Sequence, residues 1–329
     1  MTWEELDWAA LDRLRAGFLQ AGAQTSPYWQ SASDLASYDF TYGERIGWKW
    51  DQVLRELRLR GWQPKTRTVF DWGCGSGIAG RRVIAFFGAE NFDELTLWDH
   101  SPLAVEFSEE EAKRSFPKLN VVQATPGFLA SDAPVGLLVV SHVLNELPAE
   151  ALAALRRVAD RADAILWVEP GTHAVSRQLG ALRDVLREKF HVVAPCTHER
   201  PCPALAPGRE RDWCHFFAPP PPEIFMDSNW VRFGQRAGVD LRSLPYCFVA
   251  LDRGAPAQND PSLSRVIGRP EHFKPYARLL NCDASGLADL ELPKRADPAL
   301  FKELERTKAP LVFRWRRDGD KILGAEMLR

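Results

Sequence analysis

The sequence lacks several features that would place it in a specialised class of protein. Its formal net charge is only −2 at pH 7, so no global basic field holds it on nucleic acid, and such contacts must come from local patches. No apolar run reaches membrane-spanning length. The first residues, MTWEELDWAALDRL, are acidic and show neither the basic region of a signal peptide nor the arginine-rich character of a transit peptide. We therefore expect a cytoplasmic protein.

Cysteine is also scarce, with six in 329 residues, which excludes a secreted disulfide scaffold. Three of the six lie in one proline- and arginine-rich stretch, APCTHERPCPALAPGRERDWCHF (194–216), together with two histidines. In a reducing compartment such a group is more typical of a metal site than of disulfides.

What the sequence does contain is a regular alternation of short apolar runs and amphipathic helical patterns after Pro64. The runs are TVFDW (68–72), LTLWD (95–99), NVVQA (120–124), VGLLVVS (135–141), AILWVE (164–169) and KFHVVA (189–194), and PYCFVALDR (245–253) follows as another strand. Such alternation predicts an α/β fold with a doubly wound, seven-stranded sheet and crossover helices.

The flanking segments differ from this central pattern. Residues 1–62 have apolar residues at helical spacing, which predicts an N-terminal helical region. The sheet domain is expected over 63–253 and includes a cysteine-rich insertion, 195–243, without regular periodicity. Residues 254–329 predict a small β-rich appendage, with hairpin turns at Asp283–Gly286 and Asp318–Asp320.

A glycine motif, VFDWGCGSGIAG, directly follows the first predicted strand and opens a helix. Glycines at such a turn let the backbone approach a ligand that faces the helix N-terminus. The pattern D-x-G-C-G-S-G, with the acidic Asp99 ending the second strand, resembles the S-adenosylmethionine-dependent methyltransferases of the doubly wound type. The resemblance implies that Asp71, Gly73, Gly75 and Gly77 form the loop beside the methionine part of S-adenosyl-L-methionine, that Asp99 binds its ribose, and that Gln123 lies beside its adenine.

The acceptor side gives no reaction signature. The segment after the fourth strand is SHVLNELP, which lacks the Asn/Asp-Pro-Pro-aromatic tetrad of enzymes that methylate base amines. Polar side chains there can contact a substrate, and His142 can act as a base near neutral pH; alternatively, this segment only packs and caps the next helix. No catalytic residue is assigned, and methyl transfer stays an open question.

The cysteine group needs a fourth donor. Thiolates select zinc or iron–sulfur clusters, and either site takes four ligands. Besides Cys196, Cys202 and Cys214, a zinc ion can use His198 or His215, whereas a four-iron cluster needs Cys247 or Cys282. Cys247 lies in an apolar strand, where a buried cysteine is ordinary, and Cys282 lies in the turn-like NCDASG, which we expect to be exposed.

Several further motifs resemble one particular family. N-E-L after the fourth strand, VEPGT, P-C-x-H-x3-C-P, W-C-H-F, RVIGRP and L-x-C-x3-G are similar to the methyltransferase-like assembly factors of the mitochondrial small ribosomal subunit and their bacterial relatives. The resemblance implies a [4Fe-4S] cluster on Cys196, Cys202, Cys214 and Cys282, and association with the small ribosomal subunit and its rRNA. The acidic start indicates a bacterial cytoplasmic member. A catalytically silent assembly factor and a zinc-binding methyltransferase of another substrate are the alternatives.

Basic and aromatic residues are interleaved on both sides of the cysteines. They are Arg200, Arg209, Arg211, Trp213 and Phe216, followed by Arg265, Arg269, Lys274 and Arg278. This composition suits phosphate contact and base stacking, although an ordinary solvated face would have a similar pattern.

Overall fold

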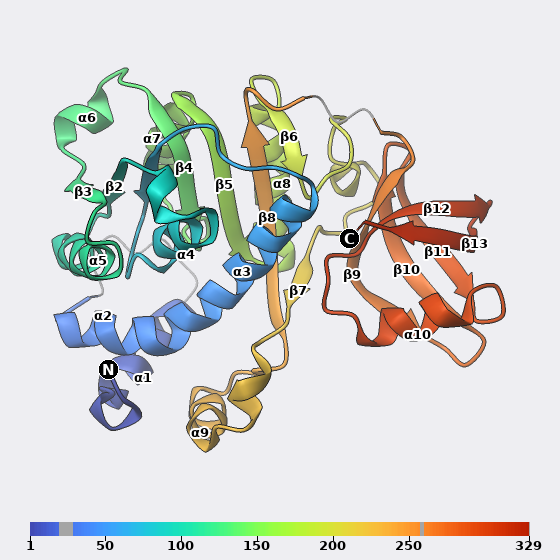
Figure 1. The fold of residues 1–329 in the computed structure, drawn as a ribbon, viewed down its shortest axis with the longest axis horizontal. Helices are drawn as coiled ribbons and strands as arrows, with labels where there is room; N and C mark the ends of the chain where they lie inside the picture. Colours follow the sequence, from blue (N-terminus) through green and yellow to red (C-terminus); the bar gives the residue numbers. More distant parts are fainter. Residues whose placement is uncertain (20–28, 257–259, 329) are drawn as a thin grey trace. The chain divides into compact units, whose positions relative to one another are not determined.

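The computed structural model describes residues 1–19, 29–256 and 260–328. The chain divides into two compact units. Figure 1 shows the elements of the chain, coloured from the N-terminus to the C-terminus. The first unit comprises Met1–Leu54, Pro64–Val168 and Pro219–Leu244, and the second comprises Arg55–Gln63, Glu169–Ala218 and Pro245–Arg329. Within the described ranges, no helix is both long enough and apolar enough to cross a membrane.

Helices form the start of the chain, as the periodicity predicts. After a short 3-10 turn (Trp3–Glu5) come α1 (Trp8–Leu19), α2 (Ala32–Tyr38), a π-helical turn (Asp39–Gly43) and α3 (Glu44–Leu59). Ser31 starts α2, because its hydroxyl accepts a hydrogen bond from the Asp34 backbone at 3.2 Å. Part of the predicted helical region, residues 20–28, lies outside the described residues.

The first unit contains five parallel strands. They are β1 (Thr68–Trp72), β2 (Glu94–Trp98), β3 (Asn120–Gln123), β4 (Val135–Ser141) and β5 (Ala162–Pro170). Their order is β3-β2-β1-β4-β5, and every neighbouring pair is parallel. The order reverses between β1 and β4, so a crevice is expected outside the carboxyl ends of these two strands.

The crossover helices of this unit are α4 (Ile78–Phe87), α5 (Pro102–Ser115), α6 (Pro126–Ala130) and α7 (Ala149–Ala159). The helix α4 packs on β1 and β4, whereas α5 packs on β2 and β3. A further helix, α9 (Ser228–Ala237), begins at the capping residue Asp227 and lies in the segment that was expected to have no regular periodicity. Its buried Trp230 and Phe233 contact each other edge to face.

The second unit contains α8 (His173–Leu186), β6 (His191–Ala194), a short β7 (Phe216–Ala218) and β8 (Leu244–Asp252). The strand β8 pairs antiparallel with β6 and also pairs with β7. All seven predicted strands of the doubly wound fold are therefore present, and the predicted methyltransferase-type α/β class is confirmed. The strand β7, like α9, interrupts the segment that the sequence predicts to be irregular.

The C-terminal part of the second unit is a closed five-stranded barrel with the order β10-β11-β13-β12-β9. Its elements are β9 (Leu263–His272), β10 (Tyr276–Asp283), β11 (Gly286–Pro293), α10 (Pro298–Arg306), β12 (Val312–Asp318) and β13 (Lys321–Met327). Both predicted hairpin turns are present. Of the strand pairings described within this barrel, that of β11 with β13 is parallel and the others are antiparallel. A five-stranded barrel with a helix between its third and fourth strands has the architecture of an OB-fold (orange to red in Figure 1).

Candidate functional site

The glycine loop connects β1 to α4 and has a left-handed backbone. Gly73, Gly75 and Gly77 have φ values of +70°, +53° and +76°, which other residues rarely adopt. A Cβ at Gly77 would lie 2.0 Å from the Ser108 hydroxyl oxygen, so packing against α5 also requires glycine there. A Cβ at Gly75 would meet no described atom within 4 Å. The loop therefore has an open side at Gly75.

Asp99 lies directly beside this loop. One carboxylate oxygen accepts a hydrogen bond from the Gly75 backbone at 3.0 Å, and the other accepts from Ser101 at 2.9 Å. His100 lies 3.2 Å from the second oxygen, and the carboxylate is mostly buried. The structure thus brings together Asp99 and the glycines, which are distant in the sequence.

Asp71 and Gln123 have other surroundings. Asp71 is fully buried, and one oxygen accepts from the Gly80 backbone of α4 at 3.0 Å. Its other oxygen has no hydrogen-bond partner among the described residues, and burial raises the pKa of this carboxyl to about 7. Gln123 is exposed at the end of β3 and donates to Glu109 at 2.6 Å. Asp71 therefore supports the start of α4, and Gln123 contacts α5.

His142 is the most unusual residue on the predicted acceptor side. Its φ is +56°, the one positive value among the non-glycine residues described. Its ring lies 2.9 Å from the Lys49 ammonium and 3.3 Å from the Ser141 hydroxyl, which also accepts from Trp50 at 3.0 Å. Burial and the charge of Lys49 lower the pKa of His142 well below its ordinary value. The imidazole is therefore neutral at neutral pH and accepts a hydrogen bond from Lys49.

Lys49 and Trp50 were not singled out from the sequence. They belong to α3, far from the β4 end in the chain, and no local pattern indicates this contact. Glu146, in the same segment after β4, is partly buried; burial and the charge of Asp99 raise its pKa to about 7.

The four cysteines predicted as ligands all belong to the second unit. Cys202, Cys214 and Cys282 belong to one cluster with the apolar Ala204, Ile267 and Leu287. Burial and the neighbouring thiols of Cys196, Cys202 and Cys282 raise the pKa of Cys214 well above its ordinary value. The expectation that Cys282 is exposed was wrong: it lies in β10 and is only 8% exposed, because it packs against Ala204, Ile267 and Leu287.

The alternative ligands have different positions. His198 is buried, and its Nε2 lies 3.6 Å from the Cys282 sulfur. His215 instead stacks on Trp213, with 4.6 Å between ring centroids. Cys247 lies in β8, and its thiol donates to the Pro170 carbonyl at 3.5 Å. Across the described ranges, no group of three or more His, Cys, Asp or Glu is arranged so that it could hold a metal ion.

Two side chains of α8 fix the backbone between the first two cysteines. Arg183 is buried and donates to the carbonyl of His198 at 2.8 Å. Asp184 accepts from the Cys202 backbone at 2.9 Å. Although burial opposes its charge, the thiols of Cys196 and Cys202 and the Asp184 carboxylate raise the pKa of Arg183. A buried cation thus lies close to the thiols.

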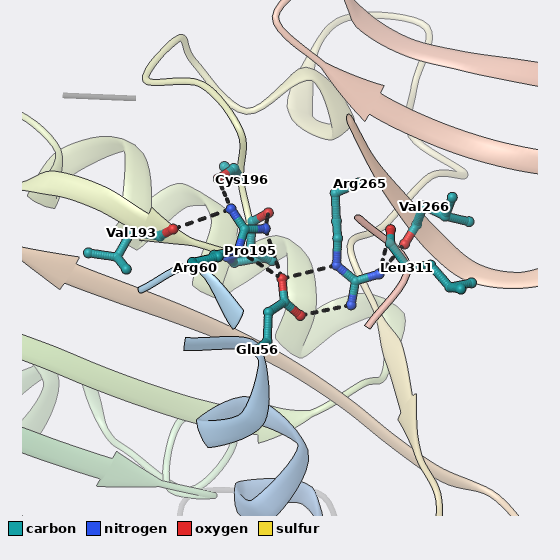
Figure 2. A network of polar contacts seen from close by, with 8 residues as sticks. All are labelled: Glu56, Arg60, Val193, Pro195, Cys196, Arg265, Val266 and Leu311. Carbon is teal, nitrogen blue, oxygen red and sulfur yellow. Dashed lines mark hydrogen bonds and ion pairs between the residues drawn. The ribbon is translucent and has the colours of Figure 1, made fainter. Parts of the chain in front are cut away.

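A second buried network holds the backbone at Cys196, as Figure 2 shows. Glu56, fully buried on α3, pairs with Arg60 at 2.8 Å and with Arg265 at 2.9 Å. Arg60 also donates to the carbonyls of Pro195 at 2.7 Å and Cys196 at 3.2 Å. Although burial opposes ionisation, the two guanidiniums hold the pKa of Glu56 below its ordinary value.

This network corrects part of the predicted basic surface. Arg265 was expected to face RNA, but it is 5% exposed and its guanidinium is held by Glu56 and by the carbonyls of Val266 and Leu311. Its guanidinium also lies 4.1 Å from the ring centroid of Phe216, which is itself buried. Neither residue is available for contact with RNA.

The chain matches a known protein family in sequence. The sequence model of the family described as "Mitochondrial small ribosomal subunit Rsm22" matches residues 51–302. The human mitochondrial ribosome assembly protein METTL17 is 26% identical over 226 residues, which cover 59% of this chain and 47% of the human protein. The chain thus matches about half the length of this curated relative.

Solved methyltransferases are more distant. Magnesium protoporphyrin IX methyltransferase from Synechocystis, with bound SAH, is 14% identical with a TM-score of 0.39, covering 76% of this chain and 97% of its own. An O-methyltransferase family protein from Burkholderia thailandensis is 15% identical with a TM-score of 0.40, covering 77% and 70%. Because the family model extends from α3 to α10, more than half of the sequence, the chain belongs to the Rsm22 family.

Proposed function

We propose that this chain is a methyltransferase-like assembly factor of the small ribosomal subunit, which binds S-adenosyl-L-methionine and holds an iron–sulfur cluster. Membership of the Rsm22 family supports the ribosomal role, as does the similarity to a human protein named for ribosome assembly. The cofactor and the cluster are supported by two groups of residues.

The gathering of Cys196, Cys202, Cys214 and Cys282 carries the proposal of a cluster. Cys196, Cys202 and Cys214 come from the cysteine-rich segment and Cys282 comes from β10, and the charges of their thiolates would influence one another. Thiolates are the donors that zinc and iron–sulfur clusters select, and binding requires their deprotonation. A bound cluster would link the cysteine-rich segment to β10. The residues Arg183, Asp184 and Arg60 hold the backbone of that segment in place.

The glycine loop and Asp99 support binding of S-adenosyl-L-methionine, which would supply an electrophilic methyl group. The open side at Gly75 admits a ligand close to the backbone, and Asp99 is already oriented by two backbone amides. Further along, His142 is held neutral by burial and Lys49. The single acceptor nitrogen of the neutral imidazole, Nε2, already accepts from Lys49, so no general base for methyl transfer is assigned.

A zinc site is the second candidate, because His198 lies 3.6 Å from the Cys282 sulfur. Three of the cysteines and this histidine would supply the four donors of a Cys₃His site. The chain would then be a zinc-binding methyltransferase-like protein.

Metal and acid-labile sulfide analysis of the anaerobically purified full chain separates these candidates. We expect iron and sulfide in about equal amounts, with the broad visible absorbance of a cluster. Cys282→Ser should lose both, whereas Cys247→Ser, a matched substitution in β8, should retain them. Zinc in place of iron, lost on His198→Ala, would support the second candidate. Full iron content in Cys282→Ser would contradict the ligand assignment.

Co-sedimentation with small-subunit precursor particles tests the ribosomal role. We expect the chain to sediment with immature small subunits and to be absent from large subunits. The same particles, incubated with methyl-labelled cofactor, report whether rRNA gains the label. Label in rRNA identifies an enzyme, and its absence despite binding identifies a silent assembly factor. Failure to sediment with small subunits would contradict the proposal.

A further inference from the structure

The C-terminal barrel has a topology that is used for oligonucleotide binding. In OB-folds the face of the second and third strands and the loops that follow the first and fourth strands bind the ligand. The second and third strands here are β10 and β11, and the corresponding loops are 273–275 and 319–320. The charges and the exposed aromatic rings at these positions decide which of them suits a nucleic acid.

Two stacked aromatic rings lie in the loop after the first strand and at the start of β10. The rings of Phe273 and Tyr276 stack with 4.8 Å between centroids, and the Phe273 backbone donates to the Tyr276 carbonyl at 2.8 Å. The Arg278 guanidinium lies 5.5 Å from the Phe273 centroid and donates to the Tyr276 hydroxyl at 3.4 Å. Phe273 is nevertheless 40% exposed, so this ring is ordered but accessible to a ligand.

Cations lie at the same end of the barrel, with the Lys294 ammonium 5.4 Å from the ring centroid of Phe301 rather than at Phe273. Lys274 is exposed at the tip of the hairpin, and the Lys294 backbone donates to the Pro275 carbonyl at 2.9 Å, which brings the exposed Lys294 and Arg295 to the same end of the barrel. Glu271 opposes them and lies 3.9 Å from Arg278. Positive charge beside an accessible aromatic ring is the composition that single-stranded nucleic acid recognises.

The neighbouring strand face has the opposite character. A hollow there is lined by Arg278 and Lys321 together with the acidic Asp289, Glu291, Asp318 and Asp320. Four carboxylates against two cations disfavour phosphate. The usual strand face of the fold is therefore a poor site for a nucleic acid in this chain, and the hairpin end is the favourable one.

We propose that the hairpin end of the barrel, formed by Phe273, Lys274, Tyr276, Lys294 and Arg295, binds single-stranded RNA. A base stacks on the exposed ring of Phe273, and the three cations contact phosphates. An unpaired strand is required, because only an unstacked base offers its face to the ring. Arg278 is a positioning residue that holds the aromatic pair. The choice of RNA rather than DNA rests on the proposed ribosomal function.

Fluorescence anisotropy of the full chain with a labelled, mixed-sequence single-stranded oligoribonucleotide tests this site. Stacking is worth about 1–3 kcal/mol per base, so Phe273→Ala should weaken binding at least roughly fivefold. Lys274→Glu should weaken it further and reduce the salt dependence. Lys321→Glu, which makes the same charge change at the acidic hollow, should bind like the unaltered chain. Thermal unfolding should be unchanged in all three, since these side chains are exposed.

Four outcomes would overturn the proposal. Equal affinity of Phe273→Ala and the unaltered chain excludes the ring, and equal weakening by Lys321→Glu moves the site to the strand face. Equal affinity for duplex RNA excludes stacking on an unpaired base. A chain that sediments with small subunits but does not bind the oligonucleotide contradicts the barrel site alone, whereas loss of sedimentation contradicts the proposed function.

Discussion

Gly75 and Gly77 lie in the same loop and both have a positive φ, but their surroundings differ. Gly77 packs against Ser108, whereas Gly75 faces open space among the described residues. Gly75→Ala should therefore cost only about 1–2 kcal/mol of backbone strain but weaken binding of S-adenosyl-L-methionine more than tenfold. Gly77→Ala should destabilise the fold more strongly. Urea unfolding measures the loss of stability in each variant, and titration calorimetry measures the affinity for the cofactor. An unchanged affinity in Gly75→Ala would show that the cofactor does not lie against the open side of the loop.

Asp71 should make stability depend on pH. Burial raises its pKa from 3.8 to about 7, so the folded state holds the proton more tightly than the unfolded chain. The resulting stabilisation is complete below pH 4 and is lost as pH rises through about 7. In Asp71→Asn the free energy of unfolding, relative to the unaltered chain, should therefore rise between these values, by up to roughly 4 kcal/mol. A difference that stays constant with pH in urea titrations would mean that Asp71 is ionised throughout.

Residue types and spacing predicted that Asp99 lies beside the glycine loop, but they did not predict the surroundings of the other candidate residues. The glycines and Asp99 follow from strand ends, because carboxyl ends of parallel strands meet at one edge. The contact between Lys49 and His142 joins residues far apart in the chain, and no periodicity encodes it. The burial of Arg265 in β9 depends on Glu56, which lies in α3 and belongs to no motif.

At the scale of elements, the Glu56 network links α3 to the cysteine-rich segment. Removing the carboxylate leaves two buried guanidiniums without their counter-charge, so Glu56→Gln should lower the free energy of unfolding by about 3–5 kcal/mol. Asp93→Asn is the matched control, because its pair with Arg67 is exposed and should contribute less than about 1 kcal/mol. Equal losses in the two variants, measured by urea unfolding, would show that the buried network is not stabilising.

The long strands and helices were predictable because their apolar periodicity extends over many residues. The sequence interpretation missed β7, α9 and α10, which are short. Their starts were encoded locally: Asp227 and Asp297 cap α9 and α10 with hydrogen bonds from backbone amides. The closed barrel was not predictable, since it depends on the non-local parallel contact of β11 with β13.

At the scale of the whole molecule, a bound cluster should couple metal content to stability. Because Cys196, Cys202 and Cys214 would share it with Cys282 of β10, removal of the metal frees the cysteine-rich segment. Chain treated with oxidant and chelator should unfold at a lower temperature and be cleaved by trypsin at Arg209 or Arg211. Cys247→Ser should respond in the same way as the unaltered chain. Identical melting and cleavage before and after metal removal would assign the ordering of this segment to protein contacts alone.

We propose that four cysteines hold an iron–sulfur cluster, with Cys282 favoured over Cys247 by the family resemblance. Mössbauer spectroscopy of iron-enriched, anaerobically purified full chain tests it most directly. We expect the spectrum of a [4Fe-4S] cluster, which disappears in Cys282→Ser and persists in Cys247→Ser. A chain that contains zinc and gives no iron signal, or an unchanged cluster spectrum in Cys282→Ser, would contradict it.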